Sequence, residues 1–158
     1  MKITLITFIL ITTFIPIKNF TVTQNKVEWT TIHQTESTAS DISKHFQSTY
    51  NASKIDTTLL YFEMQGKLDL EGAGFTKMNA PIICQSDFTA TITIEIKNSK
   101  YKATARNIKL QSLDDTYTLE QFAIKRNGDY KNIFKKSLSK VINHTLTNQT
   151  TFVPKEDW

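Results

Sequence analysis

The sequence predicts an α+β protein, with a curved antiparallel β-sheet and two helices packed on one of its faces. Apolar residues occupy every second position from Phe88 onward, which is the period of strands that bury one face. Apolar residues recur at steps of three and four after Ile42 and again after Tyr130, which is the period of amphipathic helices. The expected order is strand, N-terminal helix, four strands and a long C-terminal helix.

Composition favours one domain. The chain has 158 residues, of which 39% are hydrophobic and 22% charged, and this balance suits a single core of ordinary size. Only 4 Gly and 3 Pro are present, and neither a repeat nor a Gly/Pro/Ser linker interrupts the chain. We expect one domain over residues 26–147 and a polar tail over residues 148–158.

The first 20 residues, MKITLITFILITTFIPIKNF, have the composition of a signal peptide. Lys2 supplies a positive start and an apolar run follows, too short to span a bilayer comfortably, since spanning takes about 20 apolar residues. The sequence therefore predicts export, to a periplasm or to the outside, and no transmembrane segment in the mature protein. The lack of an Ala-x-Ala cleavage pair leaves an uncleaved anchor open as the alternative.

Individual elements can be placed along the chain. A strand is expected over Lys26 to Gln34, and a helix after the capping-box pair Thr38 and Asp41. Further strands are expected over Thr57 to Glu63 and Lys67 to Leu70, with Met64-Gln65-Gly66 as their connection.

The segment from Phe88 to Leu110 predicts a hairpin that turns at Asn98-Ser99-Lys100. In its second strand the apolar residues are odd-numbered up to Ala105 and even-numbered at Ile108 and Leu110, so one extra residue must be inserted between them. We expect a β-bulge near Arg106-Asn107. The segment Thr116 to Lys125 is compatible with a short helix or an extended chain, and the long C-terminal helix should run from Tyr130 to Leu146.

The strand pattern TITIEIKNSKYKATARNI at residues 91–108 resembles a family of exported bacterial proteins of unknown function. The helix stripe of Ile42, Phe46 and Tyr50 fits the same family, and KLDLEGAGF at residues 67–75 resembles its Gly-containing strand. The resemblance implies a TATA-binding-protein-like (TBP-like) fold and export. It implies no catalytic residue, and the name of the fold does not imply DNA binding, because function resides in sites.

No catalytic, metal or cofactor motif is present, so the leading hypothesis is a non-enzymatic domain that binds a small ligand or a protein partner. We expect the ligand in a groove between sheet and helices. The candidate lining residues are aromatic: Trp29, Tyr61, Phe88 and Tyr101.

Two alternatives come from other classes of function. The first is an enzyme whose acid and base meet only in the fold, with Asp69, Glu71 and a histidine as candidates, since Asp69 and Glu71 would share one face of a strand.

The second alternative is a polyanion site on the outer face of the C-terminal helix, formed by Lys131, Lys135, Lys136 and Lys140. It predicts retention on heparin that falls with salt. Nucleic acid is not expected as the partner of an exported protein without aromatic residues among these lysines. The single cysteine, Cys84, lies in the apolar stretch PIIC and is expected to be a buried thiol.

Overall fold

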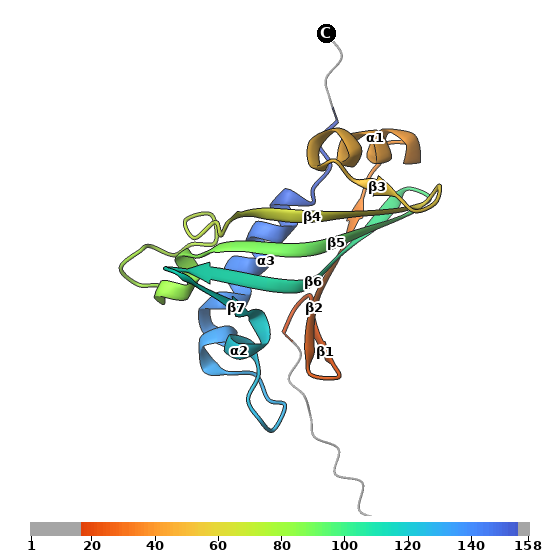
Figure 1. The fold of residues 1–158 in the computed structure, drawn as a ribbon. Helices are drawn as coiled ribbons and strands as arrows, with labels where there is room; N and C mark the ends of the chain where they lie inside the picture. Colours follow the sequence, from red (N-terminus) through yellow and green to blue (C-terminus); the bar gives the residue numbers. More distant parts are fainter. Residues whose placement is uncertain (1–16, 155–158) are drawn as a thin grey trace, which may run out of the picture.

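The computed structural model describes residues 17–154 and confirms the expected α+β class. Its strands form one antiparallel sheet in the order β1-β2-β6-β5-β4-β3, with β7 paired to the end of β6 (Figure 1). The strands are β1 (Phe20–Thr23), β2 (Lys26–Gln34), β3 (Ser53–Lys54), β4 (Leu59–Lys67), β5 (Asp87–Lys97), β6 (Lys100–Ser112) and β7 (Asp115–Thr118). The helices are α1 (Ala39–Tyr50), α2 (Leu119–Ala123), α3 (Ser139–Gln149), the 3-10 turn η1 (Ile82–Gln85) and the π-helical turn η2 (Phe134–Leu138).

The helix α3 crosses one face of the twisted sheet, and no helix of residues 17–154 lies on the opposite face (Figure 1). The buried core lies between α3, η2 and the apolar face of β2, β4, β5 and β6. Every apolar residue that the alternation assigns to the hairpin's buried face is buried, from Phe88 through Leu110. The sheet therefore has one buried face and one solvent-exposed face, as the threonine-rich positions between the apolar residues predict.

The folded domain extends beyond residues 26–147 at both ends. Phe20 begins β1, which pairs with β2, and the Phe20 ring packs edge-on against Phe134 with centroids 5.0 Å apart. At the other end α3 continues to Gln149, and the backbone N–H of Phe152 donates to the hydroxyl of Tyr101. The expected signal peptide falls largely on residues 1–16, which lie outside the described residues.

The helix α1 begins where its capping box predicts. The Thr38 hydroxyl accepts from the backbone N–H of Asp41, and the Asp41 carboxylate accepts from the backbone N–H of Thr38. The helix ends at Asn51, whose left-handed backbone (φ 55°) is a common way to stop a helix. Ile42 and Phe46 are fully buried, so this helix closes one end of the core.

The expected strand over Lys67 to Leu70 is wrong. Met64-Gln65-Gly66 do not form a turn but continue β4 as far as Lys67, and residues 68–81 then form turns and loop. The apolar spacing of Leu68 and Leu70 reflects their burial in this loop and not a strand period.

The bulge in β6 is confirmed. Thr91 pairs with Arg106 but Thr89 pairs with Lys109, so Ala90 faces two residues of β6. Asn107 absorbs the irregularity with a positive φ of 51°, which asparagine tolerates better than most residues. Beyond the bulge β6 leaves β2 and pairs with β7 instead.

The two C-terminal segments also differ in detail from expectation. Thr116 to Lys125 contains both alternatives, because β7 is followed at once by the short helix α2. The C-terminal helix includes a π-helical turn, η2, before α3 begins. Among residues 17–154, no helix is both long and apolar enough to cross a membrane.

Candidate functional site

The helix-covered face of the sheet is occupied by its own side chains. Trp29, Phe88 and Tyr101 are 0%, 2% and 1% exposed. The indole N–H of Trp29 donates to Asn143 Oδ1 on α3 at 2.9 Å, and the Tyr101 hydroxyl donates to the Thr150 carbonyl at 2.7 Å. These three residues belong to the core, whereas Tyr61 is 38% exposed on the opposite face. The four expected groove residues therefore do not lie together.

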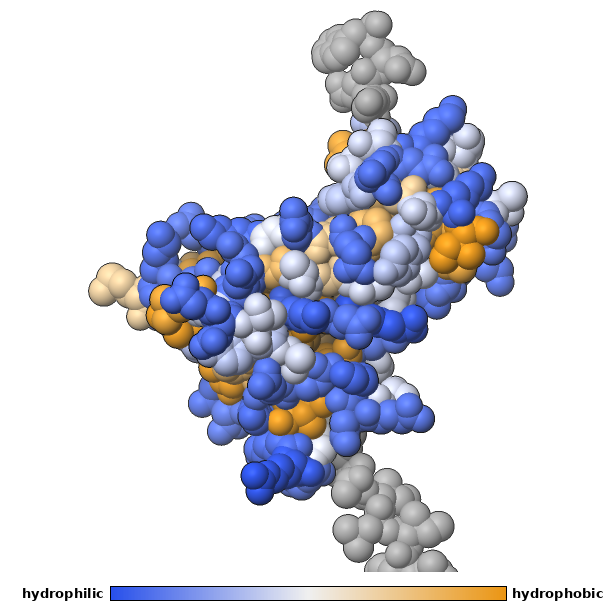
Figure 2. Space-filling model, in the orientation of Figure 1, coloured by the Kyte–Doolittle hydropathy of each residue, from blue (hydrophilic) through white to orange (hydrophobic). Residues whose placement is uncertain are grey.

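The uncovered face of the sheet has a regular polar pattern. Its side chains come from the alternate positions of β2, β4, β5 and β6 that point away from α3, and hydrophilic colours dominate this view of the molecule (Figure 2). The face contains Glu28, Thr30, Ile32, Tyr61, Glu63, Thr89, Thr91, Thr93, Glu95, Lys102, Thr104, Arg106 and Lys109. A strand period of two places all of them on one surface.

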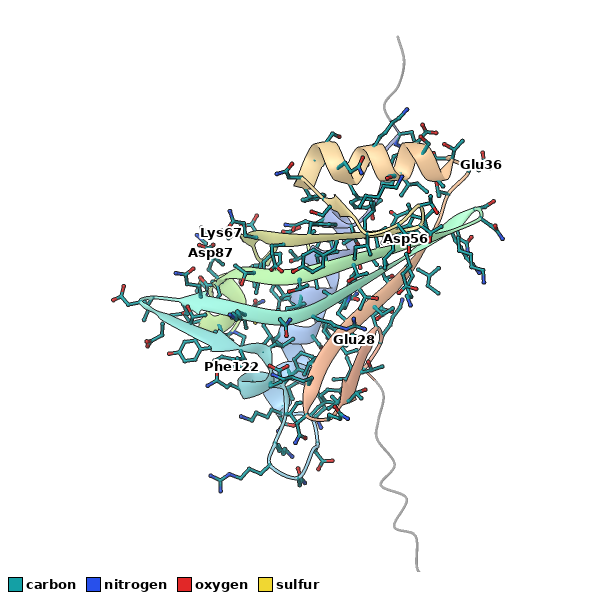
Figure 3. The ribbon with its side chains drawn as sticks, turned by 45° about the vertical axis from the view of Figure 1, so that its right-hand side comes forward. Glu28, Glu36, Asp56, Lys67, Asp87 and Phe122 are labelled. Carbon is teal, nitrogen blue, oxygen red and sulfur yellow. The ribbon has the colours of Figure 1, made fainter. Side chains whose placement is uncertain are left out.

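Charged pairs cross this face from strand to strand. Arg106 on β6 pairs with Glu28 on β2, which lies on the front of the sheet in Figure 3, and Lys102 on β6 pairs with Glu95 on β5 at 2.7 Å. These pairs are exposed, so each contributes little to stability, typically below about 1 kcal/mol. They link β2 to β6 and β6 to β5 across this face.

Glu63 forms a second small network on the same face. Its Oε1 accepts from the Tyr61 hydroxyl at 2.6 Å and from the Thr91 hydroxyl at 3.0 Å. The hydrogen bond to Glu63 raises the pKa of Tyr61, because ionised tyrosine could not donate it. Tyr61 thus remains a neutral donor at physiological pH.

A recess opens on this face beside the β6 bulge, and we call it the sheet-face recess. It has a volume of about 360 Å³, within the range of small-molecule sites. It is lined by Lys26, Glu63, Thr89, Thr91, Asn107, Ile108, Lys109, Thr118 and Glu120. The bulge creates it, because β6 there parts from β2 and turns toward β7 and α2.

In the sheet-face recess the carboxylates have hydrogen-bond donors, whereas the ammonium groups form no ion pair among the described residues. Glu120 Oε1 accepts from the backbone N–H of Val27 at 3.1 Å, and Glu63 accepts the two hydroxyls described above. Within residues 17–154, neither Lys26 nor Lys109 forms an ion pair with a carboxylate. The recess therefore offers two ammonium groups that make no ion pair in the described region, together with two carboxylates, threonine hydroxyls and an asparagine amide.

The structure brings together one acid and one histidine of the enzyme alternative. His144 Nε2 lies 3.0 Å from Asp69 Oδ2, and the other carboxylate oxygen accepts from the backbone N–H of Gly72 at 2.9 Å. A Cβ at position 72 would overlap both side chains, so any other residue there would displace Asp69 and His144. Asp69 and Glu71 lie in turns rather than on a strand, which removes the reason for expecting them on one face.

This acid–histidine pair lies apart from the main recesses of the described region. Asp69 and His144 line none of the five main recesses of residues 17–154. Burial raises the pKa of the Cys84 thiol to about 11, so it is protonated at neutral pH. The described residues contain no cluster of three or more His, Cys, Asp or Glu side chains that could hold a metal.

The lysines expected to bind polyanions are not equivalent. The Lys131 ammonium donates to the backbone carbonyl of Gln121 at 2.6 Å, before the helix begins. Lys135 and Lys136 lie in the π-helical turn and, like Lys140 on α3, are exposed. A polyanion site at these residues stays a prediction.

Sequence reasoning missed the sheet-face recess. Its one local signal was the change from odd-numbered to even-numbered apolar positions at Arg106-Asn107, which marks a bulge. Bulges often lie beside functional sites. Lys26 and Glu120 are too far from the bulge in sequence to have been assigned to the same recess.

Comparison with known proteins supports the fold alone. No family model matches the sequence, and no curated protein matches it. A TBP-like protein from Parabacteroides distasonis ATCC 8503 matches with a TM-score of 0.54 and 14% identity, covering 82% of this chain and 93% of its own. A DUF4468 family protein from Bacteroides ovatus ATCC 8483 gives a TM-score of 0.46 and 11% identity, with 84% of each chain covered. The first likeness confirms the TBP-like fold.

Proposed function

We propose that this TBP-like domain is an exported, non-enzymatic binding protein whose ligand occupies the sheet-face recess. The apolar run after Lys2 supports export. The recess supports binding, because it is a concave polar site on the only broad sheet face that no helix covers among the described residues. The recess replaces the groove expected between sheet and helices as the proposed ligand site, because Trp29, Phe88 and Tyr101 fill the space there.

The two ammonium groups favour a small ligand that carries a carboxylate or a similar anionic group, since the carboxylates of Glu63 and Glu120 already accept hydrogen bonds from the protein. Lys26 and Lys109 can each donate to it without first breaking an ion pair. Thr89, Thr91 and the Asn107 amide supply further polar groups at the wall of the recess, which suits a hydroxylated or amide-bearing molecule. Acidic sugars and short peptides combine these features.

Binding rather than catalysis is proposed for the recess, because Asp69 and His144, the acid and base of the enzyme alternative, lie outside it. Catalysis needs a nucleophile or an acid and base that converge within about 3 Å of a reacting atom. The recess offers lysines, hydroxyls and two hydrogen-bonded carboxylates, while Asp69 and His144 lie at a different place. An acid–base role for that pair stays a separate hypothesis.

A titration followed by amide NMR tests the proposal. Galacturonate, N-acetylneuraminate and the tripeptide Ala-Ala-Glu would be added singly to the purified protein, up to roughly 10 mM so that even weak binding registers. We expect at least one probe to shift the amides of Thr89, Thr91 and Lys109, and Lys109→Glu to abolish the shifts.

Lys140→Glu is the matched control, because it makes the same charge change on the outer face of α3 and should leave the shifts intact. The recess would be contradicted as the binding site if none of the three probes shifted any amide signal. It would also be contradicted if the shifts were confined to the amides of Lys135, Lys136 and Lys140. The second of these outcomes would support the polyanion alternative.

A further inference from the structure

One edge of the sheet lacks a neighbouring strand over half the length of β2. The short strand β1 pairs with β2 only from Lys26 to Trp29. From Thr30 to Gln34, β2 pairs with β6 on one side, and no described strand lies on the other.

The direction of the backbone groups along this edge follows from two hydrogen bonds. Thr30 N–H points outward to the Asn19 carbonyl at 2.8 Å, and Thr35 N–H points inward to the Ser99 carbonyl at 3.0 Å. Because the direction alternates along a strand, the N–H and C=O of Ile32 both point outward, as does the N–H of Gln34. Within residues 17–154, no other residue forms a hydrogen bond with them.

The composition of this edge does not protect it from pairing. Residues 29–34 read WTTIHQ, without Lys, Arg, Asp, Glu or Pro, and Ile32 is 59% exposed. Natural sheets usually protect free edges with charges, prolines or short strands. The edge of β4 carries Glu63 and Lys67, and β1 and β7 are four residues each, so the edge of β2 is the exception among the described strands.

There is also room beside this edge. A recess of about 520 Å³ is lined by Lys18, Asn19, Thr30, Thr31, Ile32, Asn143 and Thr147, between β2 and α3. It can take the side chains of an added strand that point toward the helix.

We propose that this edge binds a second copy of the chain, through antiparallel pairing of the two β2 strands about a two-fold axis at Ile32. Ile32 of each copy then exchanges both backbone hydrogen bonds with Ile32 of the other, and Gln34 N–H donates to the Thr30 carbonyl of the other copy. Thr30 faces Gln34 and Thr31 faces His33, so no like charges oppose each other.

The pairing buries the exposed Ile32 side chains against each other on the uncovered face. It also joins the two sheets into one, with both sheet-face recesses on the same side, because the two-fold axis is perpendicular to the sheet. The contact is five residues long, so we expect a reversible dimer that depends on concentration. It does not require that the recess binds a ligand.

Cysteine cross-linking tests the register. In this pairing, the Cα atoms of Ile32 in the two copies lie about 5.5 Å apart, which a disulfide can span. Ile32→Cys should therefore form a disulfide-linked dimer under mild oxidation. Thr30→Cys should not, because the two copies of residue 30 lie four residues apart along the strands, or about 13 Å. The native Cys84 is buried, so it should not interfere.

Sedimentation velocity tests the association itself. The full wild-type protein should shift from monomer toward dimer as its concentration rises, whereas Ile32→Lys, which places two like charges at the axis, should remain monomeric. Ile32→Pro, which removes the central donor, gives an independent variant should the lysine variant fail to fold. A wild-type monomer at every concentration, or equal cross-linking of Ile32→Cys and Thr30→Cys, would overturn the proposal.

Discussion

Replacing Trp29 by alanine is expected to lower the free energy of unfolding by about 3–5 kcal/mol, the range for a fully buried large aromatic residue. Trp29 is 0% exposed, and its loss leaves a cavity between β2 and α3 and removes one of the two donors to Asn143 Oδ1. Urea unfolding followed by circular dichroism would measure the change.

Tyr61→Ala is the matched control, because it also removes an aromatic residue that the sequence suggested for a ligand site. Its ring is 38% exposed on the uncovered face, so we expect a much smaller loss of stability. A Trp29→Ala protein as stable as the wild type would contradict the assignment of Trp29 to the core.

Replacing Tyr101 by phenylalanine is expected to cost about 1–3 kcal/mol at neutral pH, the usual penalty when a buried polar group loses its partner. The Tyr101 hydroxyl donates to the Thr150 carbonyl and accepts from the Phe152 N–H, both at 2.7 Å. Phenylalanine leaves both backbone groups without this partner and should loosen the segment after α3. Urea unfolding would give the stability, and hydrogen exchange at the Phe152 amide would report the loosening.

The pH dependence of the stability difference between wild type and Tyr101→Phe provides a control for this prediction. Burial raises the pKa of Tyr101 from 10.0 to about 12. Because the pKa of the Tyr101 hydroxyl is higher in the folded state, the stability that the hydroxyl contributes is complete below pH 10. This contribution is lost as the pH rises toward 12, because the unfolded chain releases its proton first. The stability gap between wild type and Tyr101→Phe should therefore narrow between pH 10 and 12. A gap that widens over that window would contradict a buried, hydrogen-bonded hydroxyl.

The elements that the sequence predicted best are those set by local periodicity. The hairpin from Phe88 to Leu110, its bulge and the capping box of α1 each follow from residues close together in the chain. The strand predicted over Lys67 to Leu70 failed, because the spacing of Leu68 and Leu70 in a buried loop imitates a strand period over so few residues.

The candidate site was harder to predict than the fold. Tyr61 and Trp29 are both aromatic residues in strands, but Tyr61 is exposed and Trp29 is buried. Only which face of each strand is turned toward α3 separates them. The sheet-face recess needs Lys26, Asn107 and Glu120 together, and their meeting depends on how β2, β6 and α2 are arranged in space. Local pattern holds no information about such distant contacts.

The proposed binding surface is the uncovered face of the sheet and not the helix-covered face. Native mass spectrometry of the protein recovered from the exported fraction of its own host tests it most directly, with wild type compared to Thr89→Trp, which fills the recess, and to Lys140→Trp on the far side. We expect an additional bound mass on wild type and Lys140→Trp that is absent from Thr89→Trp. The same bound mass on all three proteins, or none on any, would contradict it.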